Sequence, residues 1–484
     1  MTTRVLGGVL AAALLVTTPV AAQSLQQSPR VRQAIKLLEI WLDAQRDYEQ
    51  IPGLSAAVVH DQDVVWKGAY GFADVSKKTP ARPDTIYSIC SISKLFTSIA
   101  VMQQRDAGKV RLDDPVAKHL PWFTIKRTDA EGPEITIEGL LTHSSGLPRE
   151  SAFPYWTGPE FTFPERAQII EKVQAQETYF TAQTYHQYSN LGLTLAGEVA
   201  AAAAGTPYAA YVRQRILAPL GLTDTSPDMP KGGRLATAYS AIGRDGRRAE
   251  VKPFAAQGIG PAAGFASTAL DLAKFASWQF RLLDRKADAV LAPNTLREMQ
   301  RVHWMDPDFG APWGLGFAIW RDKEKTFVGH GGSCPGFRTH LLMHTPEEVA
   351  VVVMANAQGV DAGRFAQRAY EILGPVIKTA AKTDASKTDA SKAPDPALDR
   401  YAGTYATGFA GEVAFFPWED GLASIGLPTA DPMAGLVKWK KAGEHTFRRM
   451  RKDETLAESL VFEMQADGQA ARIIWHDNRY TRVK

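Results

Sequence analysis

The chain has 484 residues, of which 45% are hydrophobic and 22% charged, and its formal net charge at neutral pH is +3. This composition supports sizeable buried cores and excludes a chain that is disordered throughout. Lysine and arginine are spread along the sequence apart from the short cluster Arg448-Arg449-Met450-Arg451-Lys452, so nothing indicates a nucleic-acid-binding surface. A chain of this length is expected to form two or three domains.

Residues 1–22 are predicted to be a secretory signal peptide. Arg4 precedes the apolar stretch 5–16, and Val20-Ala21-Ala22 places small residues before a cut at Gln23. The alternative is a membrane anchor, but the apolar stretch is too short to span a bilayer comfortably. We therefore expect a periplasmic or secreted bacterial protein with no membrane span after signal cleavage.

The next elements predict one α/β domain over residues 30–376. A β-hairpin is expected from residue 52 to residue 73, with its turn at 61–63. Apolar residues recur at helical spacing from Ile92 until Gly108. Further helices are expected over 165–174, 191–203 and 271–283, and antiparallel strands over 313–320, 326–330, 339–344 and 349–355. Early and late strands around a helical middle suggest a sheet closed by distant parts of the chain.

The composition changes after Pro375. Two tandem copies of K-T-D-A-S, at 382–386 and 387–391, predict a flexible linker over residues 377–397. The segment 398–484 has short aromatic-rich stretches separated by turn residues, with strands expected over 401–405, 413–416, 460–464 and 471–475. This segment is predicted to be a small antiparallel β domain, barrel-like in form.

Candidate chemistry begins at Ser91-Ile92-Ser93-Lys94, where an extended segment gives way to the first helical pattern. A serine hydroxyl needs a base within hydrogen-bond reach to act as a nucleophile. In a helix, Lys94 lies on the same face as Ser91, and a partly dry, cationic site would let its amine serve as that base. Taken alone the spacing is weak, because on the order of one such tetrapeptide is expected by chance in a chain of this size.

Two later elements raise its significance. Tyr188-Ser189-Asn190 and His330-Gly331-Gly332 follow Ser91 in chain order. With these, the chain resembles the penicillin-recognising serine hydrolases, which include class C β-lactamases, serine DD-peptidases and the CubicO-type esterase group. Their elements are S-x-x-K, Y-x-N, and K-T-G or H-x-G. Connecting segments between about residues 35 and 375 also match, among them Pro52-Gly53-Leu54 and the stretch 140–146.

The resemblance implies a role for each matched residue. Ser91 would be the nucleophile, Lys94 its base, and Tyr188 a general acid and base if neighbouring cations depress its pKa. Asn190 would hydrogen-bond around Lys94 and the acyl group. The strand edge formed by His330, Gly331 and Gly332 would face the substrate, and the backbone N–H groups of Ser91 and Ser333 would form the oxyanion hole.

One departure from the family concerns the third element. It lacks the lysine and the hydroxyl of K-T-G, which in the family hold a substrate carboxylate. His330 supplies charge only when protonated, near its ordinary pKa of about 6.5. This departure favours ester or amide substrates over efficient β-lactam hydrolysis, and no carboxylate is evident for activating a deacylating water. His143 is expected to be structural, and His340 and His344 share a strand face without a third ligand, so no metal or other cofactor is expected.

The chain has two cysteines, Cys90 and Cys334. One precedes the nucleophile and the other follows the third element, and some class A carbapenem-hydrolysing relatives carry a disulfide at the matching positions. The resemblance and an oxidising compartment therefore favour a Cys90–Cys334 disulfide. The alternative is two buried small apolar side chains.

These observations predict a secreted serine hydrolase that forms an acyl-Ser91 intermediate on a small-molecule or peptide substrate, with esterase or D-amino-acid peptidase-like activity favoured. One alternative is a β-lactamase with genuine antibiotic turnover. The other is a non-catalytic penicillin-binding or regulatory protein on the same fold. The C-terminal domain is expected to contact the active-site cleft or another protein.

Overall fold

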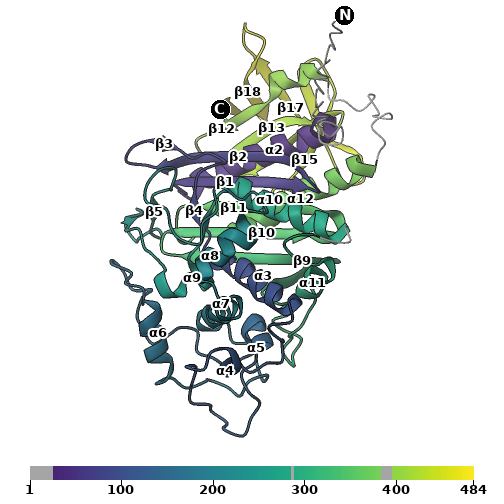
Figure 1. Cartoon of the computed structure of the whole chain (residues 1–484). Coiled ribbons are helices and arrows are strands. Elements are labelled where there is room, and N and C mark those ends of the chain that lie inside the picture. Colours follow the sequence, from purple (N-terminus) through teal and green to yellow (C-terminus); the bar gives the residue numbers. More distant parts are fainter. Residues whose placement is uncertain (1–24, 285–287, 383–394) are drawn as a thin grey trace, which may run out of the picture.

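The computed structural model describes residues 25–284, 288–382 and 395–484. The predicted signal peptide and the tandem repeats after Lys382 lie outside the described residues. Figure 1 shows three layers: a central sheet with its helices, a mainly helical region on one side, and a small β-barrel on the other. This mixed α/β architecture with a C-terminal barrel confirms the predicted fold class. None of the described helices is long and apolar enough to cross a membrane.

The central sheet has seven strands in the order β3-β2-β1-β11-β10-β9-β8, and neighbouring strands pair antiparallel. The first hairpin and the last strands of the domain thus meet at β1 and β11, as the predicted closure by distant segments requires. The strands are β1 (Gly53–His60), β2 (Asp63–Asp74), β3 (Thr79–Pro80), β8 (Ala318–Asp322), β9 (Lys325–Cys334), β10 (Phe337–His344) and β11 (Val349–Ala355).

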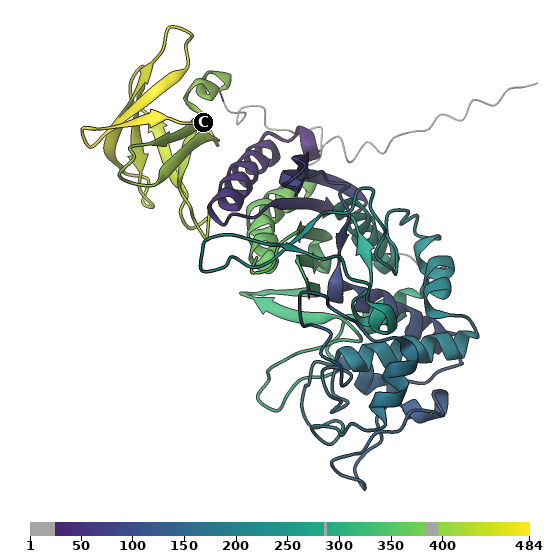
Figure 2. The same cartoon turned by 90° about the vertical axis from the view of Figure 1, so that its left-hand side faces the viewer.

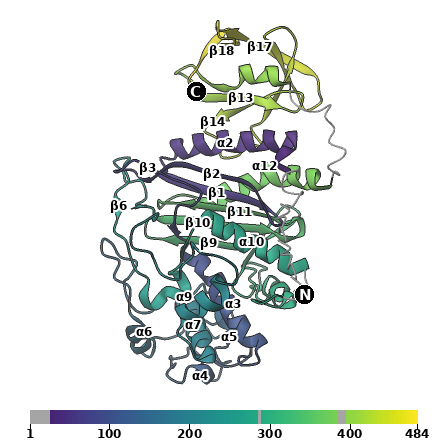
Figure 3. The same cartoon turned by 45° about the horizontal axis from the view of Figure 1, so that its top comes forward.

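Both faces of the central sheet are covered, as strand β11 shows. All seven of its residues are buried. Ala350, Val352 and Met354 enter one hydrophobic core, whereas the alternate residues enter a second core on the other face. Helix α10 (Ala269–Asp284) covers the first face. Helices α2 (Pro29–Tyr48) and α12 (Ala362–Lys382) cover the second, between the sheet and the barrel (Figure 3).

The helical region packs around α3 and α7, which contact each other and α9. Its helices are α3 (Ser93–Asp106), α4 (Val116–His119), α5 (Ile137–Thr142), α6 (Arg166–Val173), α7 (Asn190–Ala204), α8 (Tyr208–Val212), α9 (Gly260–Ala263) and α11 (Pro293–Met299). Short strand pairs join β4 (Tyr87–Ser88) to β7 (Ala266–Ser267) and β5 (Ala238–Tyr239) to β6 (Glu250–Val251). The predicted helices all form, with ends shifted by one or two residues.

The predicted strand over 313–320 is only partly correct. Strand β8 begins at Ala318, and Trp313 makes isolated bridges instead. The chain turns at Gly316, whose φ is +85°, a conformation that favours glycine. A Cβ at this position would lie 1.9 Å from Ser98 Oγ of α3, so close packing against α3 replaces regular strand pairing here.

The C-terminal residues form a closed antiparallel barrel, which stands clear of the helical region in Figure 2. Tyr401 lies in the preceding 3₁₀ turn (Pro396–Tyr401), so the first strand starts at Gly403 and not at 401 as predicted. The barrel strands are β12 (Gly403–Ala406), β13 (Glu412–Trp418), β14 (Gly421–Leu427), β15 (Val437–Lys441), β16 (Thr446–Met450), β17 (Leu456–Met464), β18 (Ala470–Trp475) and β19 (Asn478–Arg482).

The predicted start of the linker at residue 377 is wrong, because α12 continues through Pro375 to Lys382. Ile377 is fully buried in the core that α12 shares with α2. The same core includes Phe416 and Ile425 of the barrel, so the barrel packs directly on the α/β domain through α2.

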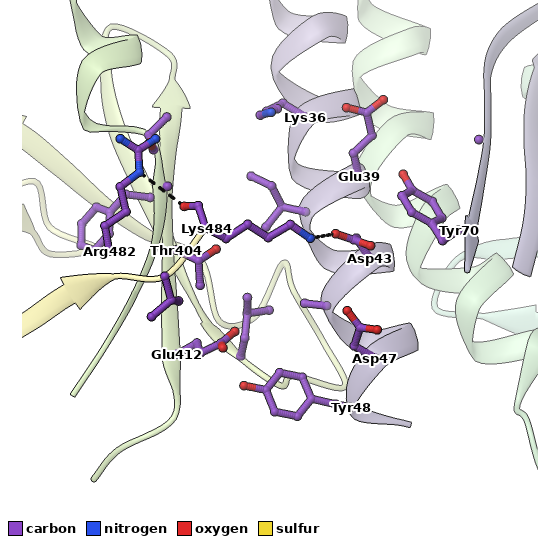
Figure 4. Close-up of a pocket in the computed structure, with 18 of the residues that line it drawn as sticks. Lys36, Glu39, Asp43, Asp47, Tyr48, Tyr70, Thr404, Glu412, Arg482 and Lys484 are labelled. Carbon is purple, nitrogen blue, oxygen red and sulfur yellow. Dashed lines mark hydrogen bonds and ion pairs between the residues drawn. The ribbon is translucent and has the colours of Figure 1, made fainter. Parts of the chain in front are cut away.

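Polar contacts reinforce this junction. Trp41 Nε1 donates to the carbonyl of Thr429 at 2.8 Å. Figure 4 shows a second contact across the cleft between α2 and the barrel, where Lys484 pairs with Asp43. Glu39, Asp47 and Glu412 are among the acidic residues that line this cleft.

Candidate active site

Ser91 lies in a 3₁₀ turn, η1 (Cys90–Ile92), that leads directly into α3. The turn packs against β9 and β10. Thr339 of β10 donates to the carbonyl of Ile89 at 3.2 Å. A Cβ on Gly332 would lie 2.4 Å from that same carbonyl, so the β9 glycine is what allows the strand to approach the turn. The segment bearing Ser91 is therefore packed against the strand of the third motif and hydrogen-bonded by Thr339 of the neighbouring strand.

Lys94 lies behind Ser91 and is fully buried. Its Nζ is 3.1 Å from Ser91 Oγ, 2.7 Å from Asn190 Oδ1 and 2.8 Å from the carbonyl oxygen of Ala262. Burial lowers the pKa of the Lys94 amine well below its ordinary value, and the positive charge of Arg149 lowers it further. A neutral amine donates to the two acceptors and presents its lone pair to the Ser91 hydroxyl.

The pKa of the Tyr188 phenol differs from what a general base at this position needs. Burial raises the pKa of the phenol, and this outweighs the lowering by a hydrogen bond with Ser91 and by the charge of Arg149. The Arg149 guanidinium and Lys94 Nζ each lie 4.9 Å from the ring centroid. The condition that the sequence attached to the role of Tyr188, a phenol pKa depressed by cations, is therefore not met: the burial that lowers the pKa of Lys94 raises the pKa of Tyr188.

Asn190 is the first residue of α7, whose start is capped by Ser189 accepting from Gly192 N–H at 2.8 Å. Asn190 Nδ2 donates to Glu150 Oε1 at 2.7 Å, so its Oδ1 is turned toward Lys94. Backbone N–H of Asn190 also donates to the carbonyl of Arg149 at 2.8 Å. The pair Arg149 and Glu150 thus sets the orientation of the asparagine.

His330, Gly331, Gly332 and Ser333 lie along β9 on one side of the cleft. His330 Nδ1 donates to the carbonyl of Gly331 at 2.6 Å. Burial and the neighbouring Lys94 lower the pKa of His330 to about 3, against the raising effect of the bond to Gly331. His330 is therefore neutral near pH 7, and this third motif provides no cation for a substrate carboxylate.

Cys90 and Cys334, the pair that the sequence favours, form a disulfide with their Cα atoms 5.6 Å apart. The bond joins the residue before Ser91 to the last residue of β9. It therefore crosslinks the first motif to the strand that carries the third.

The motifs meet at an open cleft of about 1200 Å³. The cleft is lined by Ser91, Tyr188, Asn190 and the β9 residues, whereas Lys94 is fully buried beneath this lining. Trp156, Phe161 and Val251 add an apolar part, and Arg338, His340, Gln358 and Asp361 add a polar part. None of its described lining residues comes from the barrel. Of the two expected contacts of the C-terminal domain, the one with the cleft is thus not observed among the described residues, and the one with another protein stays a prediction.

His143 is buried beside Tyr188, with ring centroids 4.3 Å apart. His340 pairs in register with Gly331, and burial lowers its pKa to about 4. In the parts of the chain that the structure describes, no group of three His, Cys, Asp or Glu side chains could hold a metal ion.

Comparison with known proteins places this geometry in a family. The profile described as Beta-lactamase matches residues 39–374. The chain belongs to this Beta-lactamase family. The matched region contains every residue that lines the cleft. The barrel lies outside the match.

Related proteins agree with this assignment. The chain is 25% identical over 397 residues to Beta-lactamase-like protein 2 of Dictyostelium discoideum, covering 77% of this chain and 68% of that protein. It is 26% identical over 315 residues to Protein flp of Staphylococcus aureus (strain NCTC 8325 / PS 47), covering 63% of this chain and 60% of the length of flp.

Two solved structures have similar folds. The octameric penicillin-binding protein homologue from Pyrococcus abyssi superposes with a TM-score of 0.60 at 22% identity, covering 93% of this chain and all of that one. A D-stereospecific amidohydrolase from Streptomyces sp. gives a TM-score of 0.58 at 25% identity, covering 69% of this chain and 97% of that one. Both similarities agree with the fold of the present chain.

Sequence reasoning brought together the residues that meet at the cleft but missed Arg149 and Glu150. They lie three and four residues after the matched stretch 140–146. The available signal was an adjacent Arg-Glu pair after a family segment, and no periodicity connects it with Tyr188 or Asn190.

Proposed function

We propose that the protein is a serine hydrolase that cleaves ester or amide bonds through an acyl-Ser91 intermediate. The observation that carries this proposal is the 3.1 Å contact between Ser91 Oγ and the buried Lys94 Nζ, whose other two neighbours are acceptors. A neutral lysine held in this way has its lone pair free for the serine proton. Membership of the Beta-lactamase family supports hydrolysis as the class of reaction.

In the proposed acylation, Ser91 Oγ bonds to the substrate carbonyl carbon as its proton passes to Lys94 Nζ. The carbonyl oxygen takes the displaced electron pair, and the backbone N–H groups of Ser91 and Ser333 are proposed to stabilise it. When the bond to the leaving group breaks, the protonated Tyr188 hydroxyl donates to the departing oxygen or nitrogen. Tyr188 then recovers a proton from Lys94, which returns both groups to their neutral forms.

In the proposed deacylation, a water oxygen bonds to the acyl carbon as its proton passes to Lys94 Nζ, and the bond to Ser91 Oγ then breaks as Tyr188 donates its proton to that oxygen. Tyr188 again recovers a proton from Lys94. Glu150 is a poor candidate for the deacylating base, because its carboxylate accepts from Asn190 and pairs with Arg149 at 3.3 Å, and it does not line the cleft. The Lys94–Tyr188 pair therefore serves both half-reactions.

The proposed substrates are carboxylic esters or D-amino-acid amides. The apolar part of the cleft, with Trp156 and Phe161, suits an apolar acyl or side-chain group. The similarity to the D-stereospecific amidohydrolase supports the amide arm. Genuine β-lactam turnover ranks below these because the third motif has neutral His330 and Gly331 in place of the lysine and hydroxyl residue of K-T-G.

Labelling of Ser91 tests the proposal. Purified wild-type protein is incubated with a fluorophosphonate probe or a fluorescent penicillin, and the adduct is located by mass spectrometry. We expect an adduct on Ser91 that S91A lacks, with turnover of p-nitrophenyl butyrate or a D-alanyl p-nitroanilide. Folded wild-type protein that forms no adduct and turns over neither substrate would support the binding-protein alternative, and rapid nitrocefin hydrolysis would favour the β-lactamase.

Export from the cytoplasm is part of the proposal. Support comes from the signal-like first 22 residues and from the Cys90–Cys334 disulfide, since disulfides persist in oxidising compartments. N-terminal sequencing of the mature protein is expected to begin at Gln23, and a cytoplasmic protein that retains Met1 would contradict it.

A further inference from the structure

His143 contacts three consecutive residues of the second motif. Its carbonyl accepts from Gln187 N–H at 2.7 Å, its ring packs on the Tyr188 ring, and its Nδ1 accepts from Ser189 N–H at 3.0 Å. One side chain with its own backbone therefore fixes the chain immediately before, at and immediately after Tyr188.

The surrounding backbone places His143 for this task. His143 ends α5 with φ at +60°, which turns the chain out of the helix. The residues that follow then run beside the segment leading to Tyr188: the carbonyls of Ser144 and Gly146 accept from Gln183 and Tyr179. His143 is the contact in this series that lies next to the phenol.

The ring has a defined protonation state. Because Nδ1 accepts a hydrogen bond from Ser189, it carries no proton, and a neutral ring holds its proton on Nε2. Burial is the main cause that lowers the pKa of His143 well below its ordinary value, and the charged or titratable neighbours Lys94, His186, His330 and Arg149 lower it further. A protonated Nδ1 would lose the bond to Ser189.

We infer that His143 is a positioning residue that holds the Tyr188 hydroxyl in line with Ser91 for proton transfer. This inference rests on the proposed function, because it assigns the residue a role in that same reaction. His143 does not line the cleft and therefore does not contact substrate. Its contribution concerns the geometry of Tyr188, so kcat should respond and KM should not.

Two parts of the contact can be separated by substitution. H143N can offer an amide oxygen near the position of Nδ1 but lacks the ring. H143F retains a ring but offers no acceptor, and H143A lacks both. H119N is the control at a second histidine, since His119 is largely buried (11% exposed), bonds Asp114 and does not line the cleft.

The measurements are kcat and KM for p-nitrophenyl butyrate, the rate of fluorophosphonate labelling of Ser91, and thermal unfolding. We expect H143A to lower kcat by ~10- to 100-fold with KM within about twofold, as misplacement of a catalytic group does. H143N should recover most of the rate, H143F should recover less, and H119N should match the wild type.

Several results would overturn the inference. These are wild-type kcat in H143A, full recovery in H143F with none in H143N, or equal losses in H143A and H119N. If H143A does not fold, the comparison of H143N with H143F decides the question. Wild-type protein that neither labels nor turns over substrate would refute the proposed function and this inference with it, whereas active wild type with unaffected His143 variants refutes this inference alone.

Discussion

Glu150 Oε1 accepts a hydrogen bond from the side-chain amide of Asn190 at 2.7 Å, and the oxygen of that same amide accepts one from the buried amine of Lys94. The carboxylate does two things for the site. It fixes which end of the Asn190 amide faces Lys94, and its negative charge raises the pKa of Lys94 against the larger lowering by burial. Glu150 therefore affects the pH at which Lys94 begins to lose its proton.

Replacing this charge should move the acid side of the pH–rate profile. In E150Q the amide can still accept from Asn190, but the charge that favours protonated Lys94 is gone. The pKa of Lys94 should fall further, so the neutral base persists to lower pH and the acidic limb shifts downward. Measurement of kcat/KM from pH 4 to pH 9 tests this, with the exposed E134Q as control. An upward shift or an unchanged limb in E150Q contradicts it.

A permanently charged side chain at position 94 should stop acylation. The pKa of Lys94 is lowered by burial, so the amine is neutral and active above that pKa and is protonated below it. K94R cannot supply a base at any accessible pH, and general-base loss typically costs ~10²- to 10⁴-fold. Stopped-flow labelling of Ser91 should show this loss from pH 5 to pH 9. Labelling of K94R within tenfold of wild type would exclude Lys94 as the base.

The Cys90–Cys334 disulfide should support both stability and activity. It closes a loop of 244 residues between the segments that carry Ser91 and Ser333. On the chain-entropy view, losing such a crosslink costs up to roughly 5 kcal/mol and often less. We expect C90A/C334A to lower the urea midpoint and the rate of Ser91 labelling, while a reductant lowers both in wild type but not in the double variant. Unchanged labelling in the double variant would show that the crosslink is not needed to position Ser91.

The barrel and the α/β domain should unfold as one unit. Trp41 of α2 is fully buried and donates to Thr429 of the barrel, within a core that both parts share. Truncating a buried aromatic side chain costs about 3–5 kcal/mol. W41A should lower the calorimetric transition strongly, whereas D43A, which removes a surface ion pair with Lys484, should change it by at most about 1 kcal/mol. Two separate transitions in wild type would contradict a shared core.

Periodicity and turn residues were sufficient to predict the hairpin, helices α3, α6, α7 and α10, and most strands of the central sheet, whereas α2 and α12, the two longest of the described helices, were not predicted. The strand β11 was predicted with its observed ends because all seven residues are apolar and paired on both sides. The error at Trp313 arose because close packing of Gly316 against Ser98 is a tertiary effect. The error at residue 377 arose because Pro375 sits inside α12, whose apolar face is held by α2.

Some features of the candidate site could likewise be predicted from the sequence, and others could not. Ser91, Tyr188 and His330 could be named because each lies in a short motif with a fixed order. The protonation of Tyr188 could not, since it depends on burial that outweighs the nearby charge of Arg149. The contacts of His143 and Glu150 join segments about 40 residues apart in sequence, which no local pattern encodes.

Arg338 should determine whether the protein prefers substrates with a free carboxylate. It lies on β10 opposite Ser333 and lines the cleft, and its Nε donates to Gln358 at 3.1 Å. Within the described residues no carboxylate forms an ion pair with it, so its guanidinium is available to an anionic group. Since His330 is neutral, Arg338 is the cation on this side of the cleft.

We expect R338A to raise KM about 10-fold or more for an ester bearing a carboxylate, as loss of a hydrogen bond to a charged group does. The matched neutral ester should change by less than about twofold, and R321A, at an exposed arginine of β8, should behave as wild type. Equal effects of R338A on both esters would show that Arg338 does not select for charge.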